Sequence, residues 1–142
     1  MIGIIFSVIA GAAMSFQGVM NTRLGERIGT MEANSLVQCT AAVLSLLALA
    51  VSHSGSFSAL AQTPKLYWLG GVLGLVITVT VMLGIKNLSP TVAISVILIS
   101  QLLVAAAIDA FGWMDSEKAA FGWTKLAGLG LMLGGVVLFK LK

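Results

Sequence analysis

The chain has 142 residues, of which 58% are hydrophobic and 9% charged, and its formal net charge is +3 at pH 7. Soluble domains carry roughly a quarter charged residues, so this composition excludes a water-facing globular domain. The basic residues flank apolar segments singly or in pairs, which favours contact with anionic lipid headgroups over nucleic acid. We expect an integral membrane protein.

Long neutral stretches between the charged residues predict the membrane-spanning helices. Crossing about 30 Å of hydrocarbon takes about 20 helical residues, and aromatic residues near the segment ends mark the membrane interface. The fifth segment is the least regular, because Lys125 interrupts it and has to extend its ammonium group to the headgroups. We expect one transmembrane domain over residues 1–142, with helices at approximately residues 2–22, 33–52, 66–86, 90–112 and 120–140.

The basic residues divide almost evenly between the two sides of the membrane. With five spans, one side has five of them and the other has three, so the positive-inside rule favours a cytoplasmic C-terminus only weakly. Two interpretations stay open, a single orientation set by local details, or dual topology with copies that insert both ways and pair antiparallel. The residues on the first side are Arg23, Arg27, Lys86, Lys140 and Lys142, and those on the second are Lys65, Lys118 and Lys125.

Amide side chains follow one face of each of the first two segments. Positions separated by alternating steps of four and three residues share a face of a helix, and this spacing joins Gln17 to Asn21 and Asn34 to Gln38. In a membrane such amides either hydrogen-bond one another, each bond contributing about 0.6 to 2 kcal/mol, or line a polar cavity. Both interpretations stay open.

The fourth segment carries a carboxylate among apolar residues. At 100° per residue, Ser95 and Asp109 fall within one arc of about 80°, and Gln101 lies at the edge of that arc. Ionisable residues in a span commonly mark ion or substrate pathways. Asp109 also lies about one turn from the interfacial pair Phe111 and Trp113, so it is either an interfacial carboxylate or a group that binds protons or cations.

Enzymatic chemistry has no recognisable site in this sequence. There is no His/Cys/Asp metal constellation, no phosphate-binding loop, and no serine nucleophile with a nearby histidine base. The single cysteine, Cys39, excludes an intramolecular disulfide, and His53 is assigned no role. We expect no enzyme, no cofactor and no bound metal.

Two segments carry a resemblance to a known family. The stretch LSPTVAISVILISQLLVAAAIDAFGW contains Ser-Gln-Leu at 100–102 and an aspartate eight residues after the glutamine. The stretch FQGVMNTRLGERIGT has a glutamine, an asparagine four residues later, then Leu-Gly and a basic residue. The chain thereby resembles the YdcZ-like family of small bacterial membrane proteins, in the drug/metabolite transporter superfamily. The resemblance implies a multi-pass protein of the bacterial inner membrane with one repeat of that superfamily's fold.

The last three spans are similar, more distantly, to small multidrug resistance transporters, which work as antiparallel dimers. Pro90 and Thr91 open the fourth segment as a Pro-Thr pair does there, and GLGLMLGGV at 128–136 is similar to their dimerisation motif. The first segment has no acidic residue where those proteins carry an essential glutamate, so export of hydrophobic cations is not implied. The resemblance implies a dimer contact through Gly128, Leu129, Leu131, Met132, Gly135 and Val136.

These observations predict an all-α secondary transporter of a small polar organic solute, with export a candidate direction. It would work as an antiparallel dimer of five-helix protomers, a homodimer or a heterodimer with a paralogue, in contact with membrane lipid and not with nucleic acid. The alternative is a non-transporting membrane protein that binds a partner, or one subunit of a heterodimeric transporter. The candidate solute contacts are Gln17, Asn21, Asn34, Gln38, Ser95 and Gln101, and Asp109 is the candidate for ion coupling.

Overall fold

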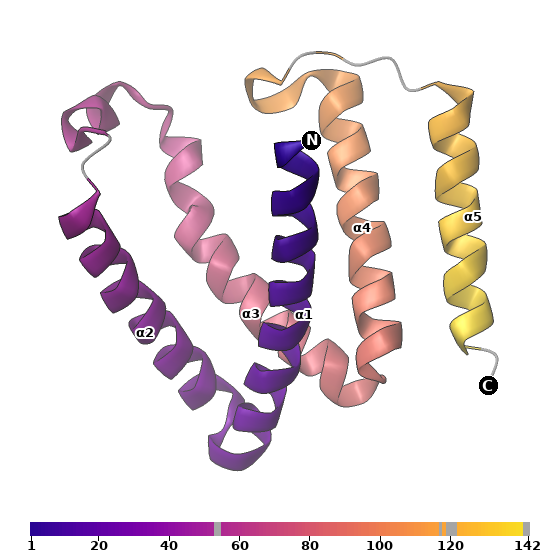
Figure 1. Ribbon diagram of the computed structural model, residues 1–142, viewed down its shortest axis with the longest axis horizontal. Helices are drawn as coiled ribbons and strands as arrows, with labels where there is room; N and C mark the ends of the chain where they lie inside the picture. Colours follow the sequence, from indigo (N-terminus) through magenta and orange to yellow (C-terminus); the bar gives the residue numbers. More distant parts are fainter. Residues whose placement is uncertain (53–54, 117, 119–121, 141–142) are drawn as a thin grey trace. The chain divides into compact units, whose positions relative to one another are not determined.

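The computed structural model describes residues 1–52, 55–116, 118 and 122–140, and all regular structure among them is helical (Figure 1). The chain divides into two units, Met1–Lys86 and Asn87–Lys142. In chain order the α-helices are α1 (Ile2–Ile28), α2 (Thr30–Val51), α3 (Gly70–Asn87), α4 (Pro90–Phe111) and α5 (Trp123–Lys140), and the short 3-10 helices are η1 (Phe57–Gln62), η2 (Lys65–Leu69) and η3 (Trp113–Asp115).

The expected all-helical membrane fold is confirmed. Among the described residues, four segments are long and apolar enough to cross a membrane, namely Ile2–Ile28, Thr30–Val51, Lys65–Asn87 and Pro90–Phe111. The apolar part of the fifth helix, Trp123–Leu138, is shorter. The expected start of that helix at residue 120 lies outside the described residues.

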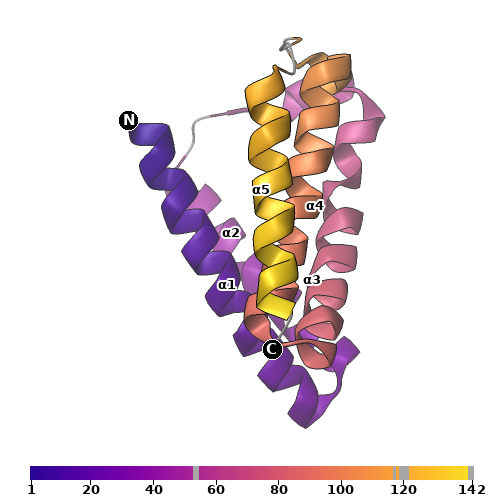
Figure 2. The ribbon, with the colours of Figure 1, turned by 90° about the vertical axis from the view of Figure 1, so that its right-hand side faces the viewer.

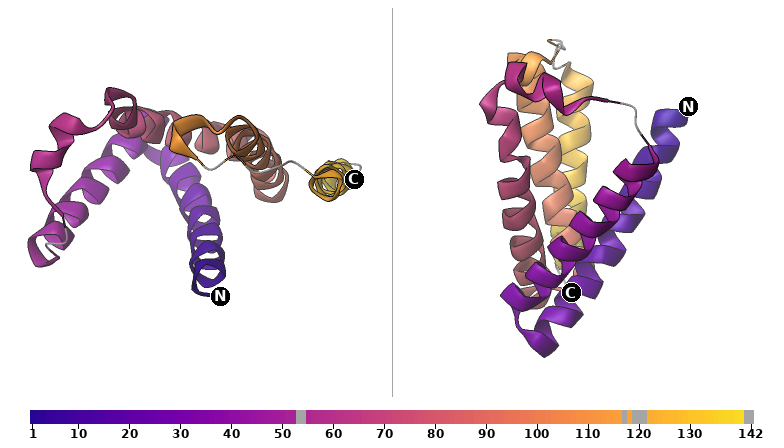
Figure 3. Two further views of the ribbon diagram at one scale, coloured as in Figure 1. Left: turned by 90° about the horizontal axis from the view of Figure 1, so that it is seen from above. Right: turned by 90° about the vertical axis from the view of Figure 1, so that its left-hand side faces the viewer.

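One residue, Gly29, separates α1 from α2. Its φ of 102° lies in the region that favours glycine. The Gly29 N–H donates to the Gly25 carbonyl at 3.0 Å, and the Gly29 carbonyl accepts from the Ala33 N–H at 3.0 Å. Backbone hydrogen bonding therefore passes through the turn almost without interruption, and the two helices diverge from it (Figures 1 and 3).

The first two helices extend further than their apolar patterns indicate. We expected a loop around Arg23 and Arg27, with helix ends near residues 22 and 33, but α1 continues to Ile28 and α2 begins at Thr30. The physical reason is that Arg and Glu are good helix formers. The Arg23 guanidinium also donates to the Glu26 carboxylate at 3.0 Å, one helical turn away. The apolar pattern indicates which part of a helix lies in the hydrocarbon and not where the helix ends. The end of α1 is set by the turn of the backbone at Gly29.

In the first unit, large side chains of α3 pack against glycines of α1. A Cβ at Gly18 would lie 3.0 Å from Ile85 Cδ1 and 3.1 Å from Val81 Cγ1, and a Cβ at Gly25 would lie 3.5 Å from Met82 Sδ. Met82 and Ile85 are among the few buried apolar residues of this unit. Small residues permit this close approach in membranes, where van der Waals packing drives helix association.

In the second unit, α4 and α5 pack side by side (Figures 1 and 2). Ser89 caps α4, because its Oγ accepts from the Val92 N–H at 3.3 Å, and Pro90 occupies the first turn, where its missing N–H is not needed. Gly112 ends the helix in the left-handed conformation with φ 66°. The ring of Phe111, the last residue of α4, stacks on the ring of Trp113 with centroids 5.3 Å apart.

The packing at Gly18 predicts a stability effect. Gly18→Leu should destabilise the first unit by about 1 to 3 kcal/mol, because the new side chain overlaps Val81 and Ile85. Gly11→Leu is the matched control, since Gly11 lies two turns earlier on the same face of α1 and a Cβ there meets nothing within 4 Å. Thermal unfolding of the purified protein in detergent measures both variants. Equal melting temperatures for the two would contradict the packing.

Candidate functional site

Polar side chains from three helices of the first unit form what we call the amide layer. It consists of Gln17 and Asn21 on α1, Asn34 and Gln38 on α2, and Thr78 on α3. Asn21 is 8% exposed and Asn34 4% exposed, although most side chains of these helices are open to the surroundings. The burial of Asn21 and Asn34 shows that these two amides face protein, whereas Gln38 and Thr78 are half-buried and Gln17 is exposed.

One hydrogen bond in the amide layer joins α2 to α3. Gln38 Nε2 donates to Thr78 Oγ1 at 3.4 Å, a long bond, and Thr78 Oγ1 in turn donates to the Gly74 carbonyl at 2.8 Å. Gly74 leaves room for the amide, because a Cβ there would lie 3.8 Å from Gln38 Nε2. The pair of bonds fixes the position of the Gln38 side chain against α3.

Asn34 Oδ1 is buried and has no hydrogen-bond partner in the described part of the chain. Leaving a buried acceptor unsatisfied costs about 1 to 3 kcal/mol in typical proteins. Thr22 is equally buried, but its hydroxyl has a partner, because it donates to the Gly18 carbonyl at 2.7 Å. The Asn34 oxygen is therefore available to accept a hydrogen bond from a water molecule or a bound solute.

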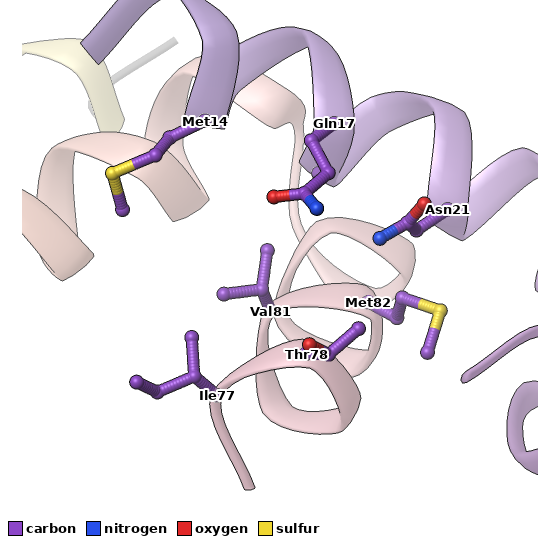
Figure 4. A pocket seen from close by; sticks show the side chains of 8 residues that line it. Met14, Gln17, Asn21, Ile77, Thr78, Val81 and Met82 are labelled. Carbon is purple, nitrogen blue, oxygen red and sulfur yellow. The ribbon is translucent and has the colours of Figure 1, made fainter. Parts of the chain in front are cut away.

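A small pocket lies between α1 and α3 beside these groups (Figure 4). Gln17 and Asn21 extend from α1 toward α3, where Thr78 faces them among apolar side chains. The pocket volume is about 50 Å³, enough for a few water molecules but far below the roughly 300 Å³ at which drug-sized ligand pockets begin. Its lining is Met14, Gln17, Gly18, Asn21, Ile77, Thr78, Val81 and Met82.

The other predicted polar residues lie on α4, in the second unit. Ser95 is half-buried, and its hydroxyl donates to the Thr91 carbonyl at 2.7 Å, whereas Gln101 is exposed. Asp109 is half-buried and lines a groove between α4 and α5, with Lys125 on the opposite wall. Among the described residues, no group of three His, Cys, Asp or Glu side chains could hold a metal ion.

The predicted dimerisation motif divides between two environments on α5. Leu129 is 9% exposed, whereas Leu131 is 78% exposed. Gly128 and Met132 line the same groove as Asp109. Gly135 and Val136 are half-buried, and a Cβ at Gly135 would meet nothing within 4 Å. One part of the motif thus packs on α4 of its own chain, and the dimer contact itself stays a prediction.

Thr78 and Gly18 contribute to the site although the sequence analysis did not single them out. The signal for Thr78 was present, because Gly74, Thr78 and Met82 follow one another at steps of four, and Ile85 follows three residues later. That spacing places all of them on one face of α3. For Gly18, only the structure shows which side chains fill the space above it.

The comparison with protein families gives the class of this membrane protein. A family model described as "Putative inner membrane exporter, YdcZ" matches residues 2–138. The chain belongs to the YdcZ family. This YdcZ protein is therefore a multi-pass transporter of the inner membrane, in the drug/metabolite transporter superfamily. No curated protein and no solved structure matches the chain.

The bond between α2 and α3 predicts a second stability effect. Thr78→Val keeps the shape of the side chain but removes the oxygen that accepts from Gln38, and it should destabilise the YdcZ protein by about 0.6 to 2 kcal/mol. Thr80→Val is the control, because the Thr80 hydroxyl bonds only carbonyls of its own helix, at Val76 and Ile77. Equilibrium unfolding in detergent compares the two. Equal free energies of unfolding for the two variants would show that the bond from Gln38 to Thr78 does not stabilise the protein.

Proposed function

We propose that this YdcZ protein is a secondary transporter of a small polar organic solute, and that the amide layer supplies hydrogen bonds to the solute. The pocket that brings Gln17 and Asn21 of α1 toward Thr78 of α3, together with the bond from Gln38 of α2 to Thr78, carries this proposal. These groups are uncharged, so they suit a neutral or zwitterionic solute better than a hydrophobic cation. The unsatisfied Asn34 oxygen adds an acceptor for a solute N–H or O–H.

A single protomer supplies only part of such a site. The pocket beside Gln17 has about 50 Å³, which is too small for an organic solute. Residues 2–14 of α1 are all exposed, and they include Ser7 and Ala10, which continue the face of Gln17 and Asn21 toward the N-terminus. We propose that a second chain, identical or paralogous and inserted with the opposite orientation, completes the site. Inverted repeats enclosing a central site are a common transporter architecture.

The family description supports export as the first direction to test. Asp109 stays the candidate for ion coupling, because it lies within the span formed by α4 and lines a groove. Arg23 and Glu26, by contrast, pair with each other beyond the apolar part of α1. Ser95 and Gln101 stay candidates for solute contact.

Flux into proteoliposomes, screened over small polar metabolites, tests the transport function. For a solute that is carried, Gln17→Leu should raise the half-saturating concentration roughly tenfold, the effect of losing about 1.4 kcal/mol of hydrogen bonding. Met14→Leu changes an apolar side chain that lines the same pocket and should leave the value within about twofold. The transport proposal fails if no solute in the panel is carried, and the amide-layer assignment fails if both variants transport equally.

Dimer formation is tested separately at α5. Gly135→Leu adds a branched side chain where the motif places a contact between protomers, and overpacking there should weaken the dimer by about 1 to 3 kcal/mol. No atom of the described residues lies within 4 Å of a Cβ at this position, so the protomer should fold normally. Gly130→Leu, at an equally open position on another face of α5, is the control. Sedimentation in detergent gives the dimer affinity, and an unchanged value for Gly135→Leu would move the interface elsewhere.

A further inference from the structure

The first unit contains a buried acceptor that its small pocket does not reach. Asn34 Oδ1 is buried without a hydrogen-bond partner among the described residues. The residues that line the pocket beside Gln17 do not include Asn34. Buried polar groups in native proteins are nearly always paired with protein, water or ligand. The side chain that separates this oxygen from the pocket therefore determines whether a solute can reach it.

Met82 of α3 connects the pocket to the part of α2 that carries Asn34. It lines the pocket, where it lies beside Asn21 (Figure 4). Its sulfur also lies 3.5 Å from the position that a Cβ at Gly25 would occupy, and the Ala33 methyl group lies 3.8 Å from that same position. Ala33 immediately precedes Asn34. One end of the pocket is thus formed by Met82, close to the first turns of α2.

The register between α2 and α3 indicates the same neighbourhood. The two helices run antiparallel (Figure 1), and Gln38 of α2 bonds Thr78 of α3. The next positions on these two faces toward the turn at Gly29, four residues away on each helix, are Asn34 and Met82. Both are buried, with 4% and 2% of their surface exposed. The register therefore places Met82 opposite Asn34.

Met82 is the flexible part of the pocket wall that α3 forms. The other lining residues from this helix, Ile77, Thr78 and Val81, are all β-branched, and β-branched side chains are stiff at χ1. Methionine is unbranched and has three rotatable bonds, so it adapts to irregular spaces. Rotation of this one side chain changes the end of the pocket without any movement of the helix backbone.

We propose that Met82 is a gate between the pocket and Asn34, and that a solute displaces its side chain in order to donate an N–H or O–H group to Asn34 Oδ1. The nature of the ligand, a small polar solute, rests on the transport function proposed above. Displacement of Met82 adds space to the 50 Å³ of the pocket and extends its polar surface from Gln17 and Asn21 to Asn34. A solute without a donor group gains no bond at Asn34, so the gate selects for solutes that carry one.

The test measures how fast a thiol at position 34 reacts. Asn34→Cys is introduced into full-length protein that carries Cys39→Ala, since Cys39 is the single cysteine of the chain. The probe is methyl methanethiosulfonate, a small neutral reagent, and mass spectrometry of the protein in detergent follows the modification over time. The measurement needs no transported solute. It therefore examines the gate even if the flux screen fails, and a failed gate leaves the flux result intact.

Met82→Ala should accelerate the reaction about tenfold, the factor that corresponds to about 1.4 kcal/mol of barrier. Met82→Ile keeps the bulk of the side chain but makes it β-branched, and it should slow the reaction about threefold. Ile85→Ala is the matched control. Ile85 is also buried on α3, but it packs against Gly18 and does not line the pocket, so truncating it should leave the rate within about twofold.

An unchanged rate in Met82→Ala overturns the gate. Equal acceleration by Met82→Ala and Ile85→Ala also overturns it, because general loosening of the packing would then explain both results. Met82→Ile preserves the side-chain volume, so its result stands even if Met82→Ala fails to fold. A rate in Met82→Ile equal to or above that of the parent protein would show that rotation of Met82 does not control access to position 34.

Discussion

Hydrocarbon offers no hydrogen bonds, and this constraint organises the first unit. Exposing an unpaired amide or hydroxyl group to lipid is costly, so Asn21 and Asn34 face protein, whereas the exposed hydroxyls of α1, α2 and α3 bond carbonyls of their own helix, as Ser7, Thr40 and Thr80 do. Asn21 and Asn34 are accordingly buried in a chain whose apolar side chains are mostly open. The bond from Gln38 to Thr78 then connects α2 to α3. Gln38, a candidate for solute contact, thus also connects α2 to α3.

Glycines make that arrangement sterically feasible. Val81 and Ile85 pack against Gly18, and Met82 packs against Gly25. Large side chains of α3 therefore contact α1 on either side of Asn21. At Gly29 the role is conformational, because φ there is positive and one residue reverses the chain. With so short a turn, Asn21 and Asn34 stand only eight and five residues from Gly29, and both lie near the closed end of the hairpin.

The sequence predicts the membrane class, the helices and the polar faces, because each depends on composition or on helical spacing. Gln17, Asn21, Asn34 and Gln38 were predicted from spacing alone; Asn21 and Asn34 are buried, Gln38 bonds Thr78 and Gln17 is exposed, and their contact with a solute stays a prediction. Helix ends were less predictable, since Arg23 and Arg27 interrupt the apolar pattern without interrupting the helix. The position of Lys125 across a groove from Asp109 could not be predicted from spacing within one helix. It depends on the register between α4 and α5, which the packing of the two helices determines.

The turn at Gly29 also determines how motion would be distributed along α1. With one non-helical residue between two long helices, a change in the angle between them is concentrated at the backbone torsions of Gly29, and α1 moves as a lever. A rotation of about 10° at this pivot would displace the far end of α1, about 40 Å away, by about 7 Å, but would move Asn21, about 12 Å away, by only about 2 Å. Large rearrangement at one membrane face is therefore compatible with a nearly stationary polar centre, which is the mechanical requirement of alternating access around a fixed site.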